Sequence, residues 1–128
     1  MSGNATSNVM SFPAAGGVSV TGNITAANIS ATGNVFFNQA IVSIAANTTA
    51  ALYTYYVITA NLTLTLPATP SVGNWINFTN RSGVTTCVLA RNGSNIMGLA
   101  QDMNLNTLNA RATMGYTGAT QGWVIMNE

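Results

Sequence analysis

The side chains that perform acid–base, nucleophilic or metal chemistry are almost missing from this chain. Its 128 residues include no His, one Cys and few charged residues, 4% of the total. The charged residues are Arg81, Arg91, Asp102, Arg111 and Glu128, and the single cysteine is Cys87. Zinc and calcium sites need several His, Cys or carboxylate ligands, and nucleophilic triads need a base such as His. The sequence therefore predicts a protein that is not an enzyme and that binds no metal or cofactor.

The few charges that exist also argue against other functions. A glycosidase needs two cooperating carboxylates, and Asp102 with the terminal Glu128 makes a poor pair. A net charge of +1 is too small to follow a phosphate backbone, so we expect no nucleic acid partner. No apolar run approaches the ~20 residues of a membrane-spanning helix, so we expect no membrane insertion. Arg111 is a candidate partner for Asp102, across a sheet or between subunits.

Composition predicts a folded chain with neutral surfaces. Hydrophobic residues make up 48% of the chain, and disorder by composition needs low hydrophobicity with high net charge. The polar residues are mainly Asn, Thr, Ser and Gly, which give little electrostatic repulsion between molecules. We therefore expect much of the surface to be covered by other subunits.

Short alternating segments predict an all-β fold. Leu62, Leu64 and Leu66 alternate with two Thr, which places three Leu on one face of a strand. Asn92-Gly93 is the strongest hairpin signal, and Cys87 lies in an expected buried strand. Strands are expected at residues 40–44, 51–59, 62–66, 74–79, 84–90, 96–99, 103–108, 112–117 and 122–126. This spacing predicts an antiparallel β-sandwich over residues 39–128.

The first third of the chain has a different pattern. Residues 1–17 contain Gly and Pro without periodicity and predict a flexible N-terminal arm. Residues 18–38 contain the repeat SVTGNI at 19–24 and SATGNV at 30–35, which predicts a short two-repeat β-stem with Gly-Asn turns. One copy of such a ribbon cannot bury its apolar side alone, whereas several copies around a shared axis can.

Three runs resemble a β-module found at the ends of bacteriophage tail fibres and tailspikes. They are LPATPSVGNWINF at 66–78, ARNGSNIMGL at 90–99, and the segments MGYT at 114–117 and GWVI at 122–125. The Thr-Gly-Asn steps of the stem resemble the shaft repeats that often precede such modules. The resemblance covers roughly residues 18–128 and implies a homotrimeric, all-β virion protein without implying an activity.

The short stem favours one virion role over others. About twenty extended residues reach at most ~70 Å, which is too short to hold a receptor-binding tip far from a particle. A trimeric capsid decoration, or cement, protein at local threefold sites on the outer capsid surface fits better. In this hypothesis Val9, Met10 and Phe12 of the arm bind the major capsid protein. The expected trimer interface is Val18, Val20, Ile24, Ile29, Val35, Phe36 and Phe37.

An alternative is the receptor-binding tip of a short tail fibre or tailspike, located on the tail. Exposed aromatic rings would then stack on the sugars of a host surface glycan, with Asn and Thr supplying hydrogen bonds. The candidate receptor contacts are Tyr53, Tyr55, Trp75 and Tyr116. Packing in a core or interface is the competing role for each of these rings.

Overall fold

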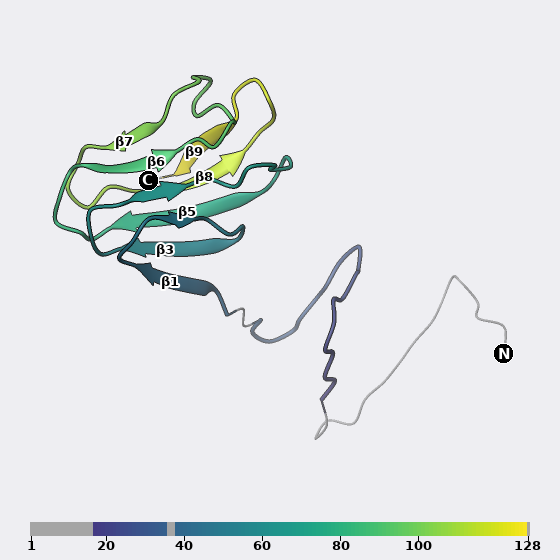
Figure 1. Ribbon diagram of the computed structural model, residues 1–128. Helices are drawn as coiled ribbons and strands as arrows, with labels where there is room; N and C mark the ends of the chain where they lie inside the picture. Colours follow the sequence, from purple (N-terminus) through teal and green to yellow (C-terminus); the bar gives the residue numbers. More distant parts are fainter. Residues whose placement is uncertain (1–16, 36–37, 128) are drawn as a thin grey trace, which may run out of the picture. The chain divides into compact units, whose positions relative to one another are not determined.

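The computed structural model describes residues 17–35 and 38–127 (Figure 1). The chain divides between Phe36 and Phe37 into two units, each described here by itself. Residues 17–35 form neither helix nor strand within the single chain. A lone apolar ribbon has no second layer against which to bury its side chains, so isolated strand pairing there is only marginally stable.

The second unit is built from β-strands alone, and the described residues contain no helix. The expectation of an all-β fold is therefore confirmed. No helix in the described ranges is long and apolar enough to cross a membrane. The strands are β1 (Ala40–Ile44), β2 (Thr48–Thr49), β3 (Thr54–Ile58), β4 (Thr63–Thr65), β5 (Trp75–Asn80), β6 (Cys87–Ala90), β7 (Met103–Leu105), β8 (Arg111–Tyr116) and β9 (Trp123–Asn127).

Two mixed sheets hold these strands, and the prediction of an antiparallel arrangement is wrong. One sheet has the order β1-β3-β5-β8-β9 and the other β2-β4-β6-β7. Four of the strand pairs are parallel: β1 with β3, β3 with β5, β2 with β4, and β4 with β6. The remaining pairs are antiparallel, namely β5 with β8, β6 with β7, and β8 with β9.

The chain path explains the parallel pairs. From β1 to β6 the chain alternates between the two sheets, so each return to a sheet adds a strand in the same direction (Figure 1). Parallel neighbours require a crossover, and here a strand of the other sheet provides it instead of a helix. Ala40 thus lies beside Thr54, and Tyr55 lies beside Asn77. Alternation along a strand reports which face is buried, but it carries no information about the direction of the neighbouring strand.

One hydrophobic core draws side chains from both sheets. Ile58, Ile76 and Met114 come from the five-stranded sheet, while Leu64 and Leu89 come from the four-stranded sheet; all five are fully buried. Burial alternates along β3, β5 and β8, as a period of two requires. Each sheet therefore turns one face to the core.

The turn at Asn92-Gly93 forms as the sequence predicts, but it does not make a hairpin. Both residues have positive φ, 49° and 92°, and the Ser94 N–H donates to the Arg91 carbonyl at 3.2 Å. This is the geometry of a type I′ turn. The partner of β6 is β7, which follows only after a further loop. Asp102 in that loop accepts a hydrogen bond from the Arg91 N–H at 2.9 Å.

Candidate functional site

The candidate sites in the described part of the chain are exposed apolar and aromatic side chains. Within residues 17–35 and 38–127, no three His, Cys, Asp or Glu side chains gather where they could hold a metal ion. Cys87 is fully buried in β6, as the sequence predicts, and its Sγ lies 3.6 Å from the Ala60 carbonyl oxygen.

The residues expected at a trimer interface are uncovered within the single chain. Their side chains are 49 to 73% exposed: Val18, Val20, Ile24, Ile29 and Val35. Phe36 and Phe37, which complete this set, lie outside the described residues, as do Val9, Met10 and Phe12 of the expected capsid-binding arm. No charged residue lies between Gly17 and Val35. The segment is therefore an uncharged, extended stretch of chain with exposed apolar side chains.

The edge strand β1 is a second exposed apolar surface. It pairs only with β3 in the sheet, and four of its five residues are exposed. Ile41 and Val42 project on opposite faces, and both are exposed. Edge strands of soluble proteins are usually protected by charge, proline, a bulge or a covering segment. The sequence AIVSI contains neither charge nor proline, so this edge lacks two of these protections.

Three of the four candidate receptor contacts come together at one site. The Trp75 ring packs edge-to-face against Tyr53 and Tyr55, with ring centroids 5.7 and 5.4 Å apart. Tyr53 is exposed and has a positive φ of 60°, a conformation that non-glycine residues rarely adopt. Its hydroxyl accepts a hydrogen bond from Asn74 Nδ2 at 2.8 Å. The trio of Tyr53, Tyr55 and Trp75 is thus held in place by packing and by one side-chain hydrogen bond.

Tyr116 lies apart from this aromatic trio. It follows Ala112 and Met114 by the strand period of two, and both of these residues are buried. Its ring packs against the fully buried Trp123, with centroids 5.6 Å apart. Tyr55 and Trp75 occupy the alternate positions of their strands, away from the core. The structure thus places Tyr116 with the core and the other three rings on the opposite face of the sheet.

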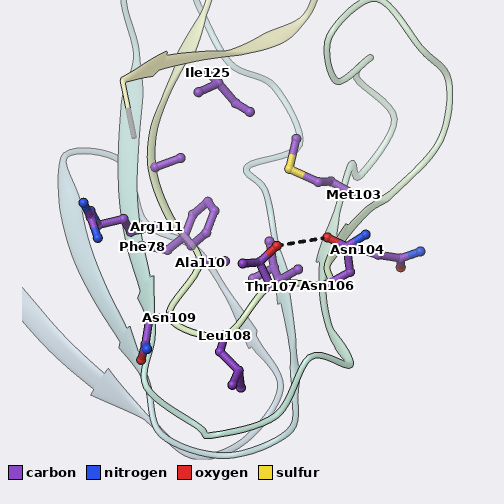
Figure 2. Close-up of a pocket in the computed structure, with 12 residues that line it drawn as sticks. Phe78, Met103, Asn104, Asn106, Thr107, Leu108, Asn109, Ala110, Arg111 and Ile125 are labelled. Atoms are coloured by element: carbon purple, nitrogen blue, oxygen red, sulfur yellow. Dashed lines mark hydrogen bonds between the residues drawn. The ribbon is translucent and has the colours of Figure 1, made fainter.

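A groove beside β7 is a surface that the sequence analysis missed. Figure 2 shows Phe78, Met103 and Ile125 around a hollow of about 410 Å³, with Leu108 at one end. A second hollow of about 310 Å³ shares Met103 with the first and is also lined by residues from the loop before β7. Three large apolar side chains along the two hollows are exposed: Met97, Leu99 and Leu108.

The groove exists because one sheet has a strand fewer than the other. β7 is the last strand of the four-stranded sheet and pairs only with β6. Met97 and Asn95 cover the start of β9, through hydrogen bonds between their main chains and that of Trp123. Ile125 of β9 lines the first hollow. The alternation of Met103, Asn104 and Leu105 predicts a strand next to this groove. It does not show that the strand lacks a neighbour on one side.

Comparison with known proteins adds no assignment to these surfaces. No family model matches the chain, and no curated protein matches its sequence.

Proposed function

We propose that this chain is a structural virion protein of a bacteriophage, a homotrimeric capsid decoration protein that stabilises the head shell at local threefold sites. The two sheets with their shared core form the β-sandwich knob of each subunit. The stem at residues 18–38 joins three copies, and the arm at residues 1–17 binds the major capsid protein on the outer surface of the head. The role is mechanical and needs no chemistry.

The observation that carries this proposal is the exposed apolar stem. Exposed side chains such as Ile24 and Ile29 have no covering partner among the described residues of the single chain. Burying apolar surface contributes about 25 cal/mol per Å², so three copies that cover each other's stems gain stability in proportion to the covered area. The absence of charge between Gly17 and Val35 removes repulsion between copies. The uncovered edge of β1 supports self-association in the same way.

The trimer is tested by placing charge on the stem. We expect the double variant Ile24→Asp/Ile29→Asp to sediment as a monomer, because a trimer would bury its carboxylates in an apolar interface. The matched control is Asn23→Asp/Asn28→Asp, which adds the same charge at the preceding polar positions and should remain trimeric. A wild-type chain that sediments as a monomer at every concentration would rule out the trimer.

The capsid role is tested separately by removing the arm. Deletion of residues 1–17 should leave the trimer intact and abolish its binding to capsids that lack this protein. The arm carries Val9, Met10 and Phe12 on an uncharged chain, and such a segment can add to a sheet edge through main-chain hydrogen bonds. Unchanged capsid occupancy after the deletion would contradict the role of the arm.

A second candidate, the receptor-binding tip of a short tail fibre or tailspike, is favoured by the aromatic trio. Tyr53 projects its ring next to Trp75 in a backbone conformation that costs free energy, and exposed rings can stack on the sugars of a host glycan. Copy number separates the two functions. Quantitative mass spectrometry of particles should find hundreds of copies for a decoration protein and at most a few dozen for a fibre tip.

A further inference from the structure

The tight turn after β6 contains the one position in the sequence where glycine follows asparagine, Asn92-Gly93. Both residues are exposed, and a Cβ added at Gly93 would meet nothing within 4 Å. Asparagine is among the residues that heat and time degrade most readily. We propose that this turn is a site of spontaneous deamidation, in which the side-chain amide of Asn92 becomes a carboxylate. The inference does not depend on the proposed trimer.

The reaction needs water and no enzyme. Hydroxide takes the proton of the Gly93 main-chain nitrogen, which then attacks the side-chain carbon Cγ of Asn92. A new bond between this nitrogen and Cγ closes a succinimide ring, the bond between Cγ and Nδ2 breaks, and Nδ2 takes a proton from water and leaves as ammonia. Water then opens the ring at either carbonyl and gives aspartate or isoaspartate. One water molecule is consumed for each ammonia released, and no atom is oxidised or reduced.

The residue after an asparagine controls how easily this attack occurs. Glycine has no Cβ to obstruct its own nitrogen, and it adopts backbone conformations that other residues avoid. The ring closes only when the turn opens locally. The main-chain hydrogen bond of the turn, from the Ser94 N–H to the Arg91 carbonyl, is 3.2 Å long, at the upper end of the usual range. Opening of this exposed turn therefore costs less than opening of a strand.

Deamidation removes a hydrogen bond that joins the ends of two strands. Asn92 Nδ2 donates to the main-chain carbonyl of Leu66, just after β4, at 2.9 Å, and the Leu66 N–H donates to the carbonyl of Ala90 in β6 at 2.8 Å. A carboxylate has no proton to donate, so the product leaves the Leu66 carbonyl without its side-chain donor. Because Leu66 is fully buried, this loss destabilises the join between β4 and β6.

The same reaction removes the net charge of the chain. Three Arg stand against two carboxylates, Asp102 and Glu128, which gives a formal net charge of +1. One additional carboxylate brings the formal net charge to zero. Proteins without net charge associate and precipitate more readily. A single event at Asn92 therefore changes both the stability of the knob and the solubility of the whole chain.

Ageing of the native, full-length protein tests the site. The protein is incubated in mildly alkaline buffer made with heavy-oxygen water, and tandem mass spectrometry then locates each modified residue. We expect Asn92 to lose its amide at least about tenfold faster than the exposed Asn104, Asn106 and Asn109, which precede Leu, Thr and Ala. The product should contain heavy oxygen and be a mixture of aspartate and isoaspartate. Equal rates at all four positions, or an intact Asn92 in native protein while the urea-unfolded chain reacts, would overturn the proposal.

A variant that carries the product tests the structural consequence. Asn92→Asp reproduces the aspartate form, and Asn104→Asp is the matched control with the same charge at an exposed position of β7. Both variants should lower the isoelectric point equally. Asn92→Asp alone should lower the midpoint of thermal unfolding, by about 5 °C. Equal midpoints for the two variants would show that the hydrogen bond to Leu66 does not stabilise the join and would contradict this part of the inference.

Discussion

The N–H of Trp123 donates a hydrogen bond to the carbonyl oxygen of Asn95 at 2.9 Å, and this approach is possible because the residue before Trp123 is a glycine. A Cβ at Gly122 would lie 1.9 Å from the same carbonyl oxygen, and the residue has a φ of +70°. The contact ties the loop before β7 to the start of β9.

Replacing this glycine should destabilise the knob strongly. We expect Gly122→Ala to lower the free energy of unfolding by about 4 kcal/mol, because the new Cβ overlaps a main-chain atom and the backbone is left-handed. Gly83→Ala is the control: its φ of +78° is similar, but open space surrounds it, so about 1 to 2 kcal/mol is expected. Urea denaturation of both variants measures the difference, and equal losses would contradict the steric explanation.

A buried amide organises the turn after β5. Asn80 is fully buried; its Nδ2 donates to the Val84 carbonyl at 2.9 Å, and its Oδ1 accepts from the Ser82 hydroxyl at 2.6 Å. Asn80→Ala should cost about 3 kcal/mol, since it leaves buried polar groups without partners. Asn77→Ala, which removes a single hydrogen bond to Thr113 at a half-buried position, should cost about 1 kcal/mol. Thermal unfolding of the two variants tests this order, and a smaller loss for Asn80→Ala would contradict it.

The thiol of Cys87 should be inert in the folded protein. It is fully buried, and its Sγ lies between the Ala60 carbonyl and the Ser82 hydroxyl, 3.6 Å from each oxygen. An exposed thiolate is the nucleophile that attacks a thiol reagent, so labelling of this buried thiol should require unfolding. A thiol-specific chromophore should react only as urea unfolds the chain, with a midpoint that matches circular dichroism. Rapid labelling of the native protein would show that β6 opens locally.

The two tryptophans should report on different surfaces. Trp123 is fully buried, whereas Trp75 lies half-buried beside Tyr53. In the variant Trp75→Phe, the fluorescence of Trp123 should resist quenching by acrylamide, and in Trp123→Phe the fluorescence of Trp75 should be quenched. If the aromatic trio binds a glycan, added host polysaccharide should protect Trp75 and leave the signal of Trp123 unchanged. Protection of neither ring by any host glycan would argue against the receptor-binding alternative.

The features that could be predicted from the amino-acid sequence are those that depend on residues close together in the chain. The alternation of apolar side chains predicts bounds for β4 and β5 that lie close to those in the structure, because a period of two is a local property of an extended chain. It also identified Cys87 as buried and Asn92-Gly93 as a tight turn, since positive φ at both positions is a local preference. Residues 96–99 were expected to be a strand, but Ile96 and Leu99 form only an isolated bridge.

The pairing of the strands and their directions could not be predicted from local patterns, because they depend on long-range packing. The parallel pairing of β1 with β3 follows from the path of the chain through the other sheet, and no local pattern encodes that path. The same holds for the separation of Tyr116 from Trp75 and for the groove beside β7, both of which depend on segments far apart in sequence. Side-chain alternation sets the buried face of each strand, whereas long-range packing chooses its neighbours and so creates the surfaces on which assembly would depend.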